Sequence, residues 1–211
     1  MPLKVALIDY GMGNLGSVAK ALETVGFKVI RTNKSEEIEN SNAIVLPGVG
    51  AFGDAMHHLR ELKLVDTLKR EILDRKKPFL GICLGLQLLF ERSYEFGEHQ
   101  GLGIFEGEVL HFGKNVHKVP HMGWNEIHPK REHLILENLK EGDFFYFVHS
   151  FYVSPKSKEI VLTETDYDGF YFTSGVAYEN IFAFQFHPEK SQKTGLTLLK
   201  NFKNIIENLI K

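Results

Sequence analysis

The sequence predicts an α/β fold: a three-layer sandwich whose central sheet is largely parallel and continues into a mixed or antiparallel extension. Through the first half, short apolar runs alternate with segments of helical spacing, which is typical of strand–helix–strand units and a parallel sheet. From Gly107 onward β-rich segments dominate, and a helical segment closes the chain. No linker, repeat or low-complexity tract interrupts residues 1–211, so a single domain is predicted.

The individual elements follow from the periodicity of the apolar residues. Apolar or β-branched runs without helical spacing predict strands, and apolar residues three or four apart predict helices. The predicted strands of the first half are residues 3–9, 27–31, 43–46 and 79–82, and its predicted helices are 15–25, 54–76 and 84–91. The predicted strands of the second half are residues 108–112, 143–153, 159–165, 170–177 and 181–187, and the final helix is 194–210.

Composition and charge exclude several classes of partner. The 211 residues carry 25 Lys and Arg against 27 Asp and Glu, so no basic surface for nucleic acid or an anionic membrane is predicted. The sequence shows no secretory leader, and no apolar run approaches the ~20 residues of a membrane span. The lone cysteine, Cys83, excludes an internal disulfide and zinc sites built on paired cysteines. A cytoplasmic protein with a free thiol is therefore expected.

Cys83 lies in the segment Gly81-Ile82-Cys83-Leu84-Gly85, between a predicted buried strand and a predicted helix. This segment has the pattern of a nucleophile elbow, Gly-x-nucleophile-x-Gly, in which the glycines allow a sharp turn. The dipole of a helix beginning at Leu84 would favour the thiolate form of Cys83. Most free cysteines are small buried hydrophobic residues, so the segment alone leaves both interpretations open.

His187 and Glu189 offer the base and the orienting carboxylate that a cysteine nucleophile needs. They lie at the end of an apolar predicted strand. Alternate residues of extended backbone point to the same side, so Glu189 is predicted to hold the His187 ring while Pro188 stiffens the link. The alternative interpretation is a strand-terminal histidine followed by an exposed carboxylate.

Acyl transfer also requires two hydrogen-bond donors for the oxyanion, and these are usually backbone N–H groups. Leu84, which follows the nucleophile, supplies one. The glycine-rich loop of residues 47–52 follows the strand at 43–46 and is predicted to bring the N–H of Val49 to the same edge of the sheet. Taken alone, this loop is an ordinary turn between a strand and a helix.

Neither a metal nor a nucleotide cofactor is predicted. His117 and His121 have a helical ligand spacing, but Pro120 between them prevents a helix. Residues 11–16 match G-x-G-x-x-G after a predicted strand, and two glutamates lie about twenty residues further on, as in dinucleotide-binding folds. A nicotinamide-dependent oxidoreductase is therefore the main rival, although it leaves the cysteine elbow unexplained. An inactive binding module, the third alternative, would have no need of a complete set of catalytic side chains.

Three motifs, taken in their order along the chain, resemble the signature of class I glutamine amidotransferases: residues 47–50, 81–87 and 187–189. Residues 9–14 and 120–125 are also similar to segments of the glutaminase subunits of imidazole glycerol phosphate synthases. The resemblance covers essentially the whole chain.

This resemblance implies a flavodoxin-like fold and hydrolysis of L-glutamine to glutamate and ammonia through a γ-glutamyl thioester, with no cofactor. It also implies a heterodimer with a separate cyclase subunit, a (βα)8 barrel that uses the ammonia to make imidazole glycerol phosphate in histidine biosynthesis. The implied catalytic residues are Cys83, His187 and Glu189, with the N–H groups of Val49 and Leu84 as the oxyanion hole. The implied substrate-binding residues are Gly50, Gln87, Ser150 and Phe151, and the implied partner-facing loop residues are Asn14, Met122, Trp124 and Asn125.

One departure from the family pattern concerns Val49. Many members carry two glycines after the loop proline, whereas this chain has Gly48-Val49. Because valine resists a positive φ, the N–H of Val49 is predicted not to face the oxyanion site until a partner aims it there.

Overall fold

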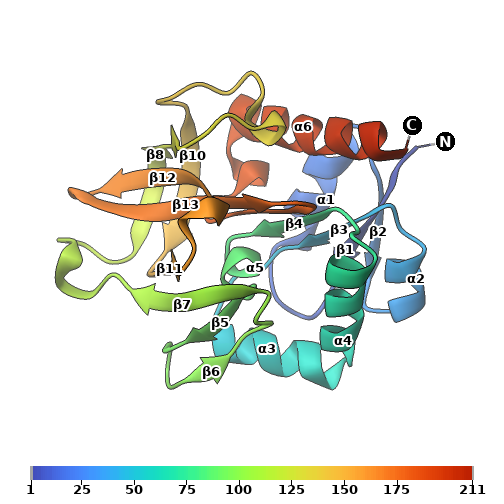
Figure 1. Ribbon diagram of the computed structural model, residues 1–211, viewed down its shortest axis with the longest axis horizontal. Helices are drawn as coiled ribbons and strands as arrows, with labels where there is room; N and C mark the ends of the chain where they lie inside the picture. The colour runs from blue at the N-terminus through green and yellow to red at the C-terminus, as the bar shows by residue number, and fades with distance from the viewer. Residues whose placement is uncertain (1, 211) are drawn as a thin grey trace.

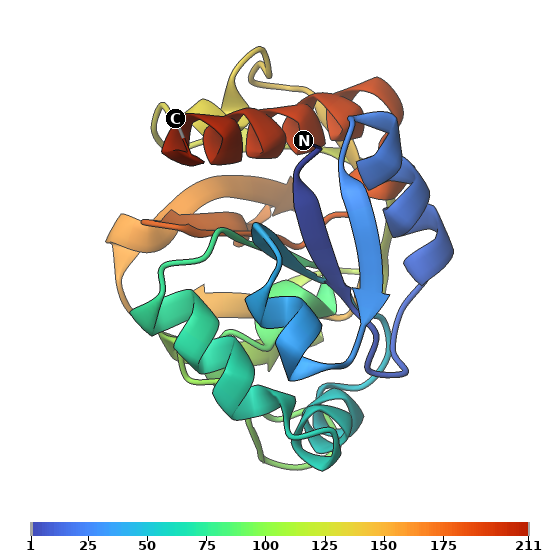
Figure 2. The ribbon, with the colours of Figure 1, turned by 90° about the vertical axis from the view of Figure 1, so that its right-hand side faces the viewer.

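The computed structural model describes residues 2–210, and within them a twelve-stranded sheet runs through the middle of the molecule (Figure 1). Helix α6 (Gln192–Ile210) and helix α1 (Leu15–Thr24) pack on one face of the sheet. Helices α3 (Phe52–Glu61) and α4 (Leu64–Lys69) pack on the other face, and Figure 2 shows the two layers on opposite sides. The three-layer α/β prediction is confirmed.

Five neighbouring strands form the parallel part of the sheet. In spatial order they are β2 (Lys28–Thr32), β1 (Lys4–Ile8), β3 (Ala43–Leu46), β4 (Phe79–Ile82) and β14 (Ile181–Phe184). Because helices cover both faces, side chains on both sides of the four inner strands are buried from Val5 onward, whereas the edge strand β2 is largely exposed or half-buried. In β1, Val5 and Leu7 belong to the apolar core under α1 and α6, whereas Ala6 and Ile8 belong to the core under α3 and α4.

The sheet continues beyond β14 with mostly antiparallel pairs, as predicted for the second half of the chain. The continuing strands are, in spatial order, β13 (Phe170–Tyr178), β11 (Phe151–Pro155), β7 (Phe105–His111), β5 (Phe90–Ser93) and β6 (His99–Gln100). Strand β12 (Val161–Tyr167) pairs with β13 and with β9 (His128–Pro129). A separate two-stranded sheet joins β8 (His121–Glu126) to β10 (Phe144–His149).

Several predicted boundaries were wrong. The predicted helix 54–76 breaks at Lys63, whose φ of 56° is left-handed, and ends as a π-helix at Arg70–Asp74. The predicted helix 84–91 stops at Gln87 in helix α5 (Leu84–Gln87), because Phe90 begins a strand that pairs with Phe105. Non-local pairing outweighs local helical spacing in that segment.

Further errors concern the site and the segments around it. The predicted strand 143–153 divides at Ser150 into β10 and β11, and the strand predicted for 181–187 ends at Phe184. The partner-facing segment around Trp124 was expected to be a loop but is strand β8, held by antiparallel pairing with β10. The short helix α2 (Ser35–Glu39) was not predicted.

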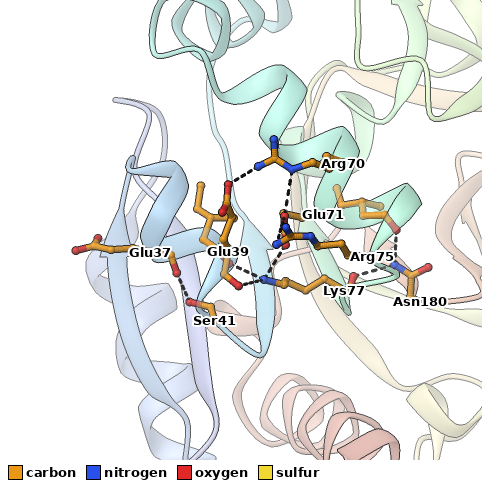
Figure 3. A network of polar contacts seen from close by, with 10 residues as sticks. Glu37, Glu39, Ser41, Arg70, Glu71, Arg75, Lys77 and Asn180 are labelled. Atoms are coloured by element: carbon orange, nitrogen blue, oxygen red, sulfur yellow. Dashed lines mark hydrogen bonds and ion pairs between the residues drawn. The ribbon is translucent and has the colours of Figure 1, made fainter.

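A buried carboxylate, that of Glu71, is surrounded by cations just before the start of β4 in the chain (Figure 3). Glu71 is fully buried, and its carboxylate lies 2.9 Å from Nζ of Lys77, 3.1 Å from Arg75 and 3.5 Å from Arg70. Lys77 Nζ also donates to two main-chain carbonyls of α2 (Ser35–Glu39) at 2.7 Å each. The lysine therefore ties helix α2 and the π-helix to the start of β4.

Replacing Lys77 with methionine should destabilise the protein by about 3–5 kcal/mol, because it leaves the Glu71 charge buried without its closest cation. Urea unfolding at pH 7 measures this loss. The matched control is Lys76→Met, since Lys76 pairs with Glu179 at a half-exposed site where ion pairs contribute about 0–1 kcal/mol. Equal losses in the two variants would contradict the role assigned to Lys77.

The same network makes stability depend on pH. Burial raises the pKa of Glu71, but Lys77, Arg75 and Arg70 outweigh burial and hold it below its ordinary value of 4.5. A lowered folded-state pKa contributes stability that is present above the unfolded pKa and is lost as the pH falls through the folded one. The difference between wild type and Lys77→Met should therefore shrink below about pH 4.5.

Candidate active site

The cysteine and the histidine leave the sheet at the same edge because their strands are parallel neighbours. In the register of β4 and β14, Ile82 lies beside Phe184. The N–H of Cys83 donates to the carbonyl of Phe184 over 2.8 Å, which extends the strand pairing by one residue. Functional groups collect at this carboxyl edge in open α/β sheets.

The elbow at Cys83 is strained and depends on its glycines. Cys83 has φ 54° and ψ −107°, a conformation that side chains rarely adopt. A Cβ on Gly85 would lie 1.9 Å from the Leu46 carbonyl oxygen, and one on Gly81 would lie 2.9 Å from the Ala183 Cβ. The helix behind the elbow has four residues, so its dipole is much shorter than the predicted helix implied.

His187 and Glu189 form a buried pair. Nδ1 of His187 lies 2.7 Å from Oε1 of Glu189, and both side chains are 3% exposed. The expected extended geometry was wrong, because Pro188–Lys190 forms a 3₁₀ turn that folds the carboxylate back onto the ring. The backbone of His187 is anchored by its N–H, which donates to Tyr146, and by its carbonyl, which accepts from Ser191.

The electrostatics of this pair favour a protonated imidazole. Burial lowers the pKa of His187, but the charge of Cys83 and the pairing with Glu189 outweigh burial and raise the pKa from 6.5 to about 10. Among residues 2–210, Nε2 of His187 has no hydrogen bond of ordinary geometry, so Cys83 acts on this pKa as a nearby charge. A protonated imidazole beside a cysteine stabilises the thiolate.

The proposed oxyanion donors are not both free. The N–H of Leu84 donates to the carbonyl of Gly48 over 3.3 Å. In a trans peptide the C=O and N–H point in opposite directions, so the N–H of Val49 points away from the elbow. Tyr10 fixes the loop, since its hydroxyl donates to the Pro47 carbonyl over 2.8 Å. Burial and then the charge of Cys83 raise the pKa of Tyr10 well above 10, so this donor keeps its proton.

A cavity of about 540 Å³ opens beside Cys83. Its lining includes the candidate oxyanion and substrate-binding residues from three separate segments of the chain, namely Val49, Gly50, Leu84, Gln87, Ser150 and Phe151. Nε2 of Gln87 donates to the Phe151 carbonyl and to Oε1 of Gln185, each over 3.1 Å. Nε2 of Gln185 in turn lies 3.6 Å from Sγ of Cys83.

Sequence reasoning missed several residues of this site. Those that line the cavity or contact the sulfur are Glu95, Phe96, Val148, His149 and Gln185. One signal was available: Gln185 is a lone polar residue inside the apolar run 181–186. Glu95, whose Oε2 accepts from the N–H of Phe52, has no comparable pattern around it.

The glycine-rich loop at residues 11–16 has a packing role. The side chain of Asn14 accepts from the Ser17 N–H and so caps the helix end that a dinucleotide would need. A Cβ on Gly13 would touch the Gly48 backbone at 3.4 Å, and one on Gly50 would lie 2.9 Å from Met12. This loop therefore packs against the oxyanion loop, and the packing does not favour the nicotinamide alternative.

The expected partner-facing residues on β8 differ in their exposure. Met122 is 59% exposed and Trp124 is 46% exposed, both on β8. The side chain of Asn125 is instead held by hydrogen bonds inside the protein. Among residues 2–210 no group of three or more His, Cys, Asp or Glu side chains could hold a metal ion. None of the helices in that range combines the length and the hydropathy that spanning a lipid bilayer requires.

A cysteine elbow after one central parallel strand, with a histidine and carboxylate after its neighbour, places this fold in the amidotransferase class. The comparisons with known proteins agree: the family model "Glutamine amidotransferase class-I" matches residues 6–205. The structure of PurLQS from Thermotoga maritima has the same fold, with a TM-score of 0.74 at 20% identity and complete coverage of both chains.

Curated relatives identify the family within this class to which the chain belongs. The chain is 59% identical over 208 residues to imidazole glycerol phosphate synthase subunit HisH of Aquifex aeolicus, covering 98% of this chain and 99% of that one. It is 48% identical over 202 residues to the same subunit of Pyrococcus furiosus, covering 96% and 99%. The chain belongs to the class I glutamine amidotransferases and, within them, to the HisH family, which confirms the family predicted from its motifs.

Proposed function

We propose that this protein is the glutaminase subunit of an imidazole glycerol phosphate synthase and hydrolyses L-glutamine to glutamate and ammonia for histidine biosynthesis. The observation that carries the proposal is that Cys83, which lines a cavity of about 540 Å³, lies close enough to the buried His187–Glu189 pair to raise the pKa of His187. The high identity to proteins named as that subunit supports the choice of substrate and pathway.

In the proposed mechanism the Cys83 thiolate attacks the side-chain carboxamide carbon of glutamine. The tetrahedral intermediate collapses when protonated His187 gives its proton to the leaving nitrogen, so ammonia departs and a γ-glutamyl thioester remains. His187 then takes a proton from water, which attacks the thioester, and glutamate and the thiolate are released. Glu189 keeps the ring oriented and stabilises its charge in both half-reactions.

The substrate is held by groups that line the cavity. Gln87 and the backbone near Gly50 lie beside the nucleophile and are assigned to the carboxamide end, whereas Ser150 and Phe151 are assigned to the amino-acid head group. The fixed hydrogen bonds of Gln87 to Phe151 and Gln185 support its role, since they orient its amide before substrate binds.

The proposed partner is a cyclase with a (βα)8 barrel, which forms a heterodimer with this chain. Ammonia released into neutral water would be protonated and lose its nucleophilicity, so a glutaminase needs an acceptor enzyme beside it. Exposed Met122 and Trp124, together with the loop at Asn14, lie on the proposed interface. That loop touches the oxyanion loop, so a partner pressing on it would act on Gly48 and Val49.

An electrophilic glutamine analogue should form one covalent adduct on Cys83 in the complex with the cyclase. Mass spectrometry of the digested protein locates the adduct, and excess L-glutamine should suppress it, whereas D-glutamine should not. The same analogue without the partner should react more slowly. An adduct elsewhere, or one that L-glutamine does not suppress, would rule out Cys83 as the glutaminase nucleophile.

A further inference from the structure

Two buried histidines face each other where β8 begins, at His121, and β10 ends, at His149. The proposed mechanism does not use either of them. His121 and His149 are cross-strand neighbours, 3% and 6% exposed. Nδ1 of His121 lies 2.8 Å from Nε2 of His149. The His121 ring lies against Phe147, stacked at 4.7 Å, and against Tyr167 at 4.1 Å, so its orientation is fixed by packing as well.

The proton positions of the pair follow from its two fixed ends. Nδ2 of Asn125 donates to the Asp166 carbonyl over 2.8 Å, and Oδ1 accepts from the Glu126 N–H, so the amide orientation is determined. The second hydrogen of Nδ2 is directed to Nε2 of His121 over 3.1 Å. Nε2 of His121 must then be the unprotonated nitrogen of that ring, and Nδ1 carries the proton.

The hydrogen bond at the other end of the pair requires the same arrangement of protons on the ring nitrogens. Nδ1 of His149 lies 2.8 Å from the Phe151 carbonyl, which can only accept, so Nδ1 of His149 is protonated. Nε2 of His149 then accepts from Nδ1 of His121. Every donor in the series Asn125, His121, His149 and Phe151 meets an acceptor.

The series ends on an atom of the proposed active site. The Phe151 carbonyl that accepts from His149 also accepts from Gln87, whose amide reaches Cys83 through Gln185. His149 itself lines the cavity beside Cys83. An unbroken set of hydrogen bonds therefore runs from strand β8, which carries exposed Trp124, to the nucleophile.

Both imidazole rings stay neutral at physiological pH, as this arrangement of protons requires. Burial lowers the pKa of His121 to about 4, against an opposing effect of Asp168. Burial and the charges of His121 and His187 lower the pKa of His149 to about 3, against the opposing hydrogen bond of Phe151. The pair is not a proton donor to the reaction near pH 7.

We propose that His149, with its tautomer fixed by His121 and Asn125, is a positioning residue that holds the Phe151 carbonyl and, through it, the Gln87 amide in place for glutamine. The proposal rests on the function proposed above. His149 acts through Phe151 and Gln87, so its loss should weaken glutamine binding more than it slows the chemical steps.

Replacing His149 with phenylalanine should raise the KM for glutamine about tenfold in the complex with the cyclase, with kcat changed less than about threefold. Tenfold corresponds to about 1.4 kcal/mol, in the range of one buried hydrogen bond. His149→Asn places an amide donor where Nδ1 lies and should recover most of the KM.

Phe172→Leu is the matched packing control, because Phe172 contacts both histidine rings but takes no part in the hydrogen bonds. It should reduce stability and leave the KM near that of wild type. If Phe172→Leu raised the KM as much as His149→Phe, or if His149→Phe left the KM unchanged, the positioning role would be wrong. If the wild-type complex released no glutamate, the proposed function itself would fail.

A second measurement does not depend on the variants. Two-bond ¹H–¹⁵N spectra of the ¹⁵N-labelled protein in its complex should show both rings neutral and protonated on Nδ1. A proton on Nε2 of His149 would overturn the assigned order, because that nitrogen could not accept from His121.

Discussion

Replacing Cys83 with alanine should abolish glutamine hydrolysis by the complex, with a loss in kcat on the order of 10⁴ to 10⁶, as when the nucleophile of a catalytic triad is removed. No other side chain can take its place, because Cys83 is the sole cysteine of the sequence. The protonated His187 and its Glu189 partner would then have no nucleophile to activate. Glutamate formation measured under saturating glutamine reports the loss.

The control for this variant uses the synthase reaction of the partner. When ammonium salt at alkaline pH replaces glutamine, the complex containing Cys83→Ala should form product at the wild-type rate, since only ammonia production is lost. Cys83→Ser should behave like Cys83→Ala, because the hydroxyl is a far weaker acid than the thiol. Glutamine-dependent turnover within tenfold of wild type would show that hydrolysis does not proceed through this side chain.

The parallel half of the fold could be predicted because its signals are local. Strands β3 (Ala43–Leu46) and β4 (Phe79–Ile82) have the predicted bounds, since each is a short apolar run with a proline beside it, Pro47 after β3 and Pro78 before β4. The strands that were missed or misplaced depend on distant partners. Strand β8 (His121–Glu126) contains a glycine and no clear alternation, and it exists through pairing with β10 (Phe144–His149).

The candidate site could be assembled from sequence for a related reason. The motifs after β4 and β14 could be recognised from their local pattern, and they meet because the two strands are parallel neighbours that end at a common edge. Contacts between single residues of different strands leave no recognisable motif in the sequence. Neither the His121–His149 pair nor the burial of Glu71 among three cations could be read from spacing, because each residue taken alone resembles an ordinary surface or core residue.

The orientation of one peptide, between Gly48 and Val49, sets the expected effect of the partner. Leu84 N–H is occupied by the Gly48 carbonyl, and the N–H of Val49 faces away. Each missing oxyanion donor costs about 10²–10³ in kcat. The isolated chain should therefore turn over glutamine at least about 10²-fold more slowly than the complex in which the peptide has rotated, and equal turnover with and without the partner would contradict this.

Replacing Val49 with glycine should raise the turnover of the isolated chain about tenfold. Val49 does not have a positive φ in this structure, and rotating its peptide by half a turn would give it one. That conformation costs a residue with a Cβ about 1–2 kcal/mol, which glycine does not incur, so the open loop becomes about 5- to 30-fold more populated.

Val49→Ala is the matched control, because alanine keeps the Cβ and loses only the branching; its basal turnover should stay near that of wild type. With partner bound, Val49→Gly and wild type should converge, because the partner already holds the loop open, so the activation ratio falls by the factor that basal turnover gains. A glycine variant with wild-type basal turnover would mean that backbone strain at Val49 does not close the oxyanion site. The barrier would then lie in the contacts that hold the Gly48 carbonyl, which are the Leu84 N–H and the loop fixed by Tyr10.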